Sequence, residues 1–339
     1  MTSLQKAVLA TIIYYDTLEF PLTSREVWRY LISPRRISPE AKGDEPVAVV
    51  NVQTALEQLR AEGKIEERLG FYSLSGKKHL YQERTEKNKL AEIKWKKARR
   101  YLYWVQLLPF IEGVLVSGSL ALGHTSEDSD LDILVVAKGG RIWMARLLIL
   151  FLYGLAGVRR RHGETTAPDK ICPNHFVTTK TLHIPFPSLY NAQTYLHLVP
   201  VYIRRNELIS DFWEANRWIN RFVDFQYKDL GLAQTGLADH PLGDYQQRAV
   251  RSSRWLSVGR KFWEFVLELA PLGNWLERAA KRLQSRRINQ NLPGRVRVSD
   301  DQLEFHPFSA ESAILQKFNQ TLANYGDFDG YVEFDSGLK

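Results

Sequence analysis

The chain has 339 residues, of which 44% are hydrophobic and 25% are charged. This composition excludes a disordered or collagen-like chain, and the length predicts two or three domains. Its 46 Lys and Arg against 38 Asp and Glu give a net charge of +8, which favours a polyanionic partner without specifying a fold. The single cysteine, Cys172, excludes a disulfide framework and a multi-cysteine metal site. The first residues lack the basic and apolar regions of a secretory signal, so we expect a cytoplasmic protein.

Residues 1–85 predict a small helical domain that ends in a β-hairpin. Thr23 and Glu26 have the spacing of a capping box at the start of a helix. Three helices followed by a hairpin resemble a winged helix-turn-helix, a domain that binds either DNA or protein. The expected elements are helices at 4–15, 24–32 and 50–62 and strands at 65–69 and 71–74.

The third of these helices is a poor match for a DNA-reading helix. Arg60 and Lys64 are its only cations, and Glu57 and Glu62 oppose them. Because phosphate contacts supply much of the affinity for DNA, contact with a protein stays open as the alternative.

A basic connecting helix is expected over residues 86–106. Its first part, 86–100, carries seven Lys or Arg against two Glu, and apolar residues follow. A solvated charged face is one interpretation of this pattern, and a basic groove wall for a nucleotide or nucleic acid is the other.

An apolar run at 142–158 is near the lower length limit for a membrane-spanning helix. Arg146 lies inside the run and three arginines follow it. We therefore interpret the run as a core helix packed against a sheet, and expect no stable membrane insertion.

The segment 113–137 carries the most informative motif of the chain. A short apolar strand precedes Gly118 and Ser119, and Asp130 and Asp132 open the next apolar strand. Residues two apart in a strand point to the same face, so the two carboxylates project together. Two neighbouring carboxylates are costly unless a cation neutralises them, and Mg²⁺ prefers such oxygen ligands. Gly118 permits a close backbone approach, and Ser119 offers a hydroxyl and an amide to phosphate.

This pattern resembles the signature of the DNA polymerase beta-like nucleotidyltransferase superfamily, and its spacing is most similar to that of the minimal bacterial nucleotidyltransferases. The matching residues are Gly118-Ser119, Gly123 and Ser129-Asp130-Leu131-Asp132. The resemblance implies a small mixed sheet with helices over residues 107–186, within an α+β protein. It also implies that Asp130 and Asp132 hold two Mg²⁺ ions, and that the nucleoside triphosphate (NTP) is bound by Gly118, Ser119, Gly123 and Ser129.

The family normally adds a third carboxylate from a neighbouring strand, and this sequence departs from that pattern. No acid occurs between Lys170 and Val177, where the strand is expected. Asn174 or Cys172 takes the position instead. The Asn174 carbonyl is able to ligate Mg²⁺, so we include it among the catalytic candidates, but an amide cannot act as a base.

Three other side chains remain candidates for the missing group. His175 has the chemistry of a base, although strict alternation points it opposite to Asn174. Glu164 and Asp169 lie in the preceding loop and would have to fold inward.

The remaining residues, 187–339, predict a helical C-terminal region. Within it, residues 245–297 carry 12 Lys or Arg against three Glu, interleaved with Trp and Phe. Such a surface suits a phosphate-rich acceptor, including nucleic acid. Amphipathic helices with cationic outer faces are the equally weighted alternative.

The resemblance therefore implies a Mg²⁺-dependent nucleotidyltransferase that moves a nucleoside monophosphate from an NTP to an acceptor hydroxyl. The acceptor, which is RNA, a protein or a small molecule, stays open, as does the oligomeric state. The missing carboxylate favours the alternative of a catalytically degenerate regulator that binds nucleotide or nucleic acid.

Overall fold

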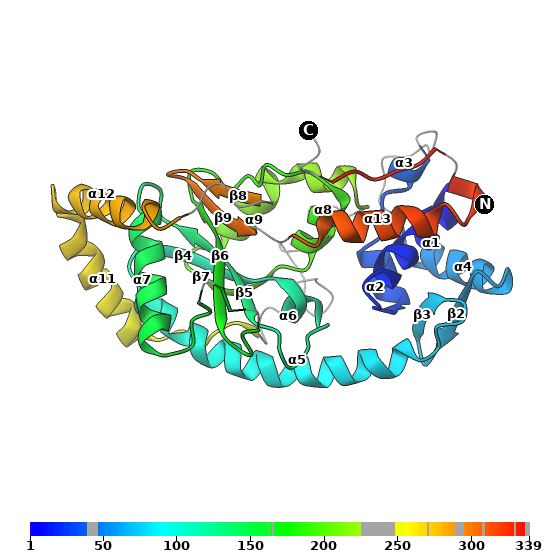
Figure 1. Cartoon of the computed structure of the whole chain (residues 1–339), viewed down its shortest axis with the longest axis horizontal. Coiled ribbons are helices and arrows are strands. Elements are labelled where there is room, and N and C mark those ends of the chain that lie inside the picture. Colours follow the sequence, from blue (N-terminus) through cyan, green and yellow to red (C-terminus); the bar gives the residue numbers. More distant parts are fainter. Residues whose placement is uncertain are drawn as a thin grey trace.

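Helices and strands alternate irregularly along the chain and assemble around two β-sheets, which makes the protein a mixed α+β structure (Figure 1). The computed structural model describes residues 1–38, 47–161, 163–164, 166–224, 248–269, 271–288, 295–306, 309–328 and 330–335.

The first elements form a helical group with a three-stranded antiparallel sheet in the order β1-β3-β2. Thr23 and Glu26 form the predicted capping box, with each side chain accepting from the other residue's backbone N–H. Thr2 and Gln5 form a second one at the start of the chain. The elements are α1 (Ser3–Asp16), β1 (Leu22–Thr23), α2 (Ser24–Arg29), α3 (Pro34–Ile37), α4 (Val49–Ala61), β2 (Ile65–Arg68) and β3 (Phe71–Leu74).

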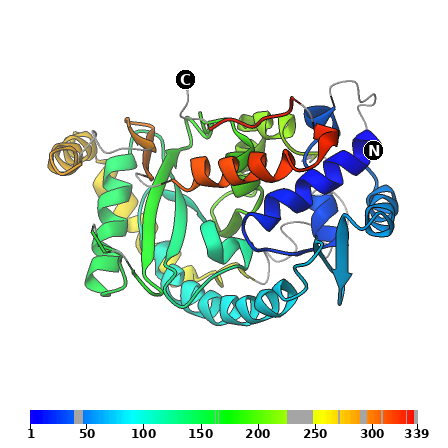
Figure 2. The same cartoon turned by 45° about the vertical axis from the view of Figure 1, so that its right-hand side comes forward.

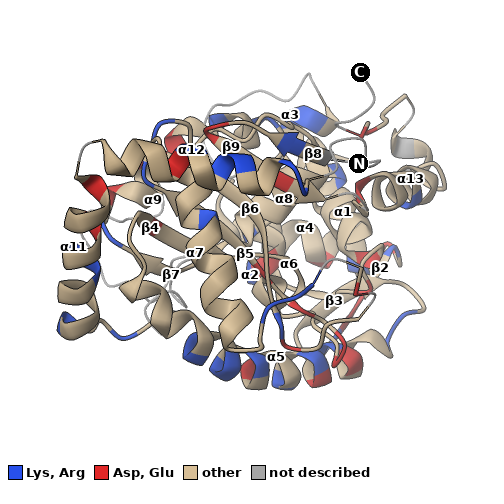
Figure 3. Cartoon of the chain, turned by 60° about the vertical axis from the view of Figure 1, so that its left-hand side comes forward, with Lys and Arg blue, Asp and Glu red and all other residues tan. Residues whose placement is uncertain are grey.

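One long helix, α5 (Leu80–Leu102), joins this group to the main sheet and continues into the 3₁₀ turn η1 (Tyr103–Leu107). It runs along one edge of the molecule in Figure 1. Trp95 and Ala98 on its inner face are buried, whereas Figure 3 shows charged residues of both signs along its length. The helix is therefore amphipathic, with its charges on the outer face.

The main sheet has six strands in the order β7-β4-β5-β6-β9-β8. The pair β5·β6 is parallel and the other four pairs are antiparallel, so the sheet is mixed. Each face packs against its own apolar cluster. The strands are β4 (Ile111–Val116), β5 (Leu131–Ala137), β6 (Ile171–Thr178), β7 (Val199–Ile203), β8 (Arg295–Val298) and β9 (Gln302–His306).

The expectation of a purely helical C-terminal region was incomplete. Strands β7, β8 and β9 all come from residues 187–339, and they extend both edges of the sheet. The alternation of Arg and Val over Arg295–Val298 is the local signal for one of them. Pairing with strands that lie far away in sequence places β7 beside β4 and β9 beside β6, and β8 then pairs with β9.

The apolar run predicted as a core helix forms α7 (Ile142–Leu155), which packs against β6 and α12 (Leu272–Ser285). No side chain of its own caps its first turn. Instead, the carboxylate of Glu277 on α12 accepts from the backbone N–H groups of Trp143 and Met144 at 2.9 and 3.0 Å. Among the described residues, no helix combines the length and apolarity that crossing a bilayer requires.

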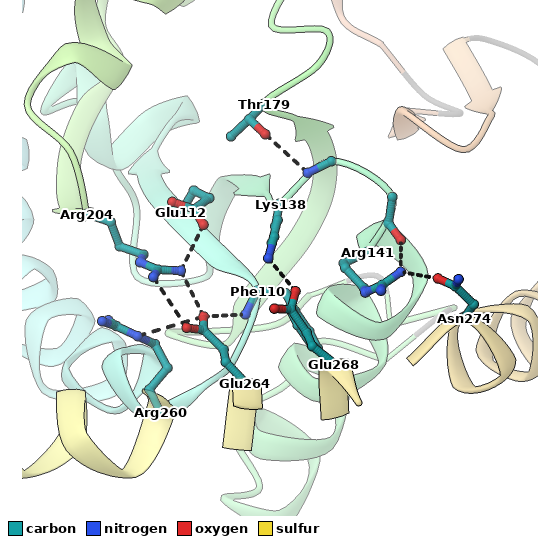
Figure 4. Close-up of polar contacts among 12 residues, drawn as sticks. Phe110, Glu112, Lys138, Arg141, Thr179, Arg204, Arg260, Glu264, Glu268 and Asn274 are labelled. Carbon is teal, nitrogen blue, oxygen red and sulfur yellow. Dashed lines mark hydrogen bonds and ion pairs between the residues drawn. The ribbon is translucent and has the colours of Figure 1, made fainter. Parts of the chain in front are cut away.

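Helix α11 (Arg254–Glu268) is attached to the sheet by its acidic residues (Figure 4). Glu264 accepts from Arg204 at 2.8 Å and from the backbone N–H of Phe110 at 3.0 Å, and Glu268 pairs with Lys138. The acids of this helix therefore face the protein, which leaves other side chains on its outer face.

The last helix, α13 (Glu311–Leu322), returns to the N-terminal group and lies beside α1 (Figure 2). The rings of Tyr14 and Phe318 meet edge-on with centroids 5.8 Å apart. The remaining elements are α6 (Gly118–Leu122), α8 (Leu189–Leu196), α9 (Glu207–Ala215), η2 (Arg217–Arg221) and η5 (Gly326–Phe328).

Candidate active site

The turn from β4 into α6 lies directly against the start of β5. The backbone N–H of Ser117 donates to the carbonyl of Asp132 at 3.0 Å. Gly118 has a φ of +67°, and a Cβ at this position would lie 2.6 Å from Oδ2 of Asp132. Glycine is therefore required here for two reasons: the backbone is left-handed, and the carboxylate of Asp132 lies too close for a side chain.

Asp130 and Asp132 project together, as strand alternation predicts. Their carboxylates and the sulfur of Cys172 each offer one ligand atom, and these atoms lie within 4.8 Å of one another. Arg160 Nη1 donates to Asp130 Oδ2 at 2.5 Å, and Asn174 Nδ2 donates to Asp132 Oδ1 at 2.7 Å. Each aspartate thus has its own polar partner.

The environment favours the protonated form of Asp132. Burial raises its pKa to about 7, and the negative charge of Asp130 adds to the increase, against the hydrogen bond from Asn174. Burial and the two aspartates also raise the pKa of the Cys172 thiol, which keeps its proton. Near neutral pH, a cation at this position would be favoured because it stabilises the charged form of Asp132.

A β-bulge in β6 changes which side chains face the aspartates. Ile133 pairs with Pro173 and Leu134 pairs with His175, so Asn174 is an extra residue between them. The side chain of Asn174 therefore reaches Asp132. His175 pairs with Leu134, so its side chain lies on the same face of the sheet as those of Leu134 and Asp132. The expectation that His175 points away from Asn174 was wrong, because it assumed unbroken alternation.

The two acids of the preceding loop are held by lysines. Glu164 Oε1 accepts from Lys170 at 2.7 Å, and this bond keeps the pKa of Glu164 below its usual range. Asp169 pairs with the buried Lys94 at 3.0 Å and with Lys97. Burial raises the pKa of Asp169, but the hydrogen bonds from these two lysines outweigh it and the pKa falls. Neither loop acid belongs to the ligand cluster found at Asp130 and Asp132 among the described residues.

A cavity of about 1460 Å³ opens beside this cluster. Of the predicted site residues, Gly118, Asp132 and Asn174 line it, and so do three residues considered for the missing group, Glu164, Cys172 and His175. Five arginines also line it: Arg146, Arg159, Arg160, Arg161 and Arg287. They were not predicted as site residues, although three consecutive arginines at 159–161 are a local signal for an anion-binding surface. Such a set of cations suits a polyanionic ligand.

The other residues predicted to bind the phosphates, Ser119, Gly123 and Ser129, do not line this cavity. Gly123 is the left-handed C-cap of α6, with a φ of +75°. The hydroxyl of Ser129 accepts from the backbone N–H of Ser126 at 3.0 Å and so closes a turn. Ser119 lies inside α6, where its carbonyl accepts from the backbone N–H of His124 at 2.9 Å.

Comparisons of this chain with protein-family models, with curated proteins and with solved structures found no match.

Proposed function

We propose that the chain is a metal-dependent nucleotidyltransferase that transfers a nucleoside monophosphate from an NTP to an acceptor hydroxyl. The observation that carries this proposal is the placement of Asp132 against the Gly118 turn, with Asp130 next to it, beside a cavity lined with arginines. The same sequence pattern resembles the polymerase beta-like superfamily, which implies that residues 107–186 form its core. Separately, the three helices and hairpin of residues 1–85 resemble a winged-helix domain. The predicted connecting segment 86–106 falls on α5 (Leu80–Leu102), which begins six residues earlier than expected, and on η1 (Tyr103–Leu107). We retain the cytoplasm as the expected compartment.

The donor set fits Mg²⁺. Asp130 and Asp132 supply hard carboxylate oxygens. Burial and the charge of Asp130 raise the pKa of Asp132, so a bound cation would favour its charged form. These two residues would hold the ions, and Asn174 would join them after its amide rotates to present Oδ1. Bound Mg²⁺ supplies charge neutralisation at the triphosphate and polarises the phosphorus that is attacked.

The remaining roles follow from the residues of the chain. Because Gly118 has no side chain, the carboxylate of Asp132 lies directly against the turn, which would hold a metal bound by Asp132 close to the backbone. The arginines of the cavity bind and orient the phosphates. Arg160, which now pairs with Asp130, is placed to exchange that carboxylate for a phosphate oxygen when the carboxylate binds a metal.

The outer faces of α11 and α12 suit a nucleic-acid acceptor. Trp255 is 87% exposed and Phe265 is 69% exposed, so these aromatic residues are outside the core. The exposed cations Arg254 and Lys261 flank them. Aromatic rings that stack on bases, combined with cations that contact phosphates, are typical of single-strand binding. Of the segment 245–297, residues 245–247, 270 and 289–294 lie outside the described residues.

A second candidate function is a regulator that binds nucleotide without turnover. It is favoured by one specific contact, in which the amide of Asn174 donates to Asp132. The family that the sequence resembles has a carboxylate at the corresponding position. Among the residues that the structure describes, no further acid joins the aspartate cluster to take the proton of the acceptor hydroxyl.

Turnover of labelled NTPs separates the two functions. The full chain is incubated with each labelled NTP and Mg²⁺, with and without total cellular RNA, and pyrophosphate release and label transfer are measured. We expect transfer in the parent and in Asp128→Asn, an exposed aspartate of the same loop, and none in Asp132→Asn. Nucleotide binding without transfer in the parent would assign the regulator function, and unchanged transfer in Asp132→Asn would reject the site.

A further inference from the structure

Three side chains with metal-binding chemistry meet on the sheet beyond Asp132. His175 lies on β6 and pairs directly with Glu304 on β9. His306 follows Glu304 by two residues, so both side chains project from the same face of the strand. One ligand atom from each of these three residues lies within 4.8 Å of the other two.

The cluster is buried around its carboxylate. Glu304 is 0% exposed and His175 is 3% exposed, whereas the side chain of His306 is 30% exposed. A buried carboxylate is costly unless a cation or several hydrogen bonds compensate its charge. Nε2 of His306 lies 3.9 Å from Oε1 of Glu304, which is longer than a hydrogen bond but close enough for a shared ion to bind both.

The cluster also opens onto the cavity already described. His175 and His306 line that cavity together with Asp132 and Asn174. The amide nitrogen of the buried Gln302 lies 3.3 Å from Nε2 of His175, so Gln302 is placed to orient the imidazole from behind. Ligands supported by such outer contacts on one side and open to a cavity on the other are typical of sites where water or substrate completes the coordination.

We propose that His175, Glu304 and His306 bind a divalent transition metal ion, with Zn²⁺ as the natural occupant, at a site separate from the aspartate pair. Two imidazole nitrogens and one carboxylate form a donor set of catalytic zinc sites, and imidazole favours transition metals over Mg²⁺. Ligand atoms about 2.0–2.1 Å from zinc lie roughly 3.3 Å apart in a tetrahedral site. Small side-chain rotations would close the observed separation to that value.

The cavity would then hold two chemically different metal positions. The aspartate pair offers hard oxygen ligands for Mg²⁺, and the His-Glu-His cluster offers nitrogen ligands for Zn²⁺. The aspartates, however, also lie within 4.8 Å of the Cys172 sulfur, and a thiol is itself a zinc ligand. A test must therefore separate the two clusters.

Metal titration of the full chain makes this separation. Chelator-treated protein is titrated with Zn²⁺ against a chromophoric competitor, and with Co²⁺ while its visible absorption is recorded. We expect one tightly bound Zn²⁺ per chain. Glu304→Gln and His306→Gln should each weaken Zn²⁺ binding by more than about 100-fold, since even the loss of an outer-shell partner costs about 10–100-fold. His183→Gln, Asp132→Asn and Cys172→Ser should keep the affinity of the parent.

Melting temperatures control for folding. Glu304→Gln removes a buried charge at nearly constant shape, so in chelator it should melt at or above the parent's temperature, yet gain nothing from Zn²⁺. If Glu304→Gln does not fold, His306→Gln decides, because its side chain is partly exposed. The proposal is overturned if the parent binds no Zn²⁺, if both cluster variants bind it as the parent does, or if Cys172→Ser alone loses it. None of these readouts depends on NTP turnover.

Discussion

At the residue scale, the carboxyl of Asp132 lies between the negative charge of Asp130 and the amide of Asn174. Its surroundings shift its pKa in both directions. Burial and Asp130 favour the neutral form, whereas the donated hydrogen bond of Asn174 favours the charged form. The balance places the pKa near neutrality, so the charge of this one residue couples pH, metal binding and stability.

This coupling predicts the pH dependence of Asp132→Asn. The pKa of Asp132 is about 7 in the folded protein and about 3.9 in an unfolded chain, so the folded state binds the proton more tightly. The parent should therefore lose stability as the pH rises from about 4 to about 7, on the order of 4 kcal/mol at most, and the variant should not show this loss. Urea unfolding from pH 4 to 8 in chelator, with Asp128→Asn as the control, measures it. A parallel pH profile in Asp132→Asn and parent would contradict the assignment.

A second residue-scale prediction concerns Asn174→Asp. The amide of Asn174 lies 2.7 Å from Oδ1 of Asp132, so a carboxylate there would repel both aspartates without metal. In chelator, we expect the variant to be less stable than the parent by about 1–3 kcal/mol and to melt at a lower temperature. Adding Mg²⁺ should raise its melting temperature by more than that of the parent. If the parent is a weak enzyme, turnover should rise by about 10²-fold, because the variant supplies a base. An equal Mg²⁺ response in both proteins would mean that Asn174 is not beside the metal.

At the element scale, α11 separates its charges by face. Its acids Glu264 and Glu268 bond to the sheet side, and Arg260 is buried against Tyr202. The outer face therefore carries aromatic residues and cations without nearby acids of the same helix. Sequence spacing predicts amphipathicity, but it does not say which of two apolar faces will be covered.

The outer face of α11 predicts salt-dependent binding of single-stranded RNA. Arg254→Glu with Lys261→Glu should weaken binding at about 50 mM salt by roughly 10-fold and reduce the slope of log affinity against log salt by about 1–2. Arg260 is left unchanged because it is buried. Fluorescence anisotropy over a salt series measures both quantities.

The matched control reverses two exposed arginines of other elements, Arg68→Glu with Arg221→Glu, and should keep the slope of the parent. Absence of RNA binding by the parent at this salt concentration would reject the interpretation. Binding to anionic vesicles instead of RNA would assign the aromatic face to a lipid surface.

At the scale of the whole molecule, the N-terminal helices and the end of the described chain share one apolar cluster. The contact between them includes a two-point ion pair, in which Arg36 Nε and Nη2 donate to the two carboxylate oxygens of Glu333 at 2.8 and 2.9 Å. Glu333 is 3% exposed, and its backbone also bonds to Asn319 on α13. Residues almost 300 positions apart are thus tied together.

The ion pair predicts a non-additive mutant cycle. Arg36→Ala leaves Glu333 buried without its main cation and should cost about 3 kcal/mol, at the low end for a buried pair because Arg36 is 35% exposed. Arg36→Ala combined with Glu333→Ala should cost less than the sum of the two single changes. Urea unfolding of the four proteins measures the coupling, and strict additivity would show that the pair contributes nothing.

Local features of the sequence determined the capping box at Thr23, the helix along α7 and the shared face of Asp130 and Asp132. Each depends on residues a few positions apart, where turn geometry and strand alternation act directly. Tertiary structure alone decided that β7, β8 and β9 join the sheet, that Arg160 reaches Asp130, and that a bulge turns His175 toward the cavity. These outcomes depend on pairing between distant strands, and one extra residue in a strand reverses every later side chain. The sequence could therefore predict the aspartate pair, whereas the histidine cluster became visible only once β9 had paired with β6.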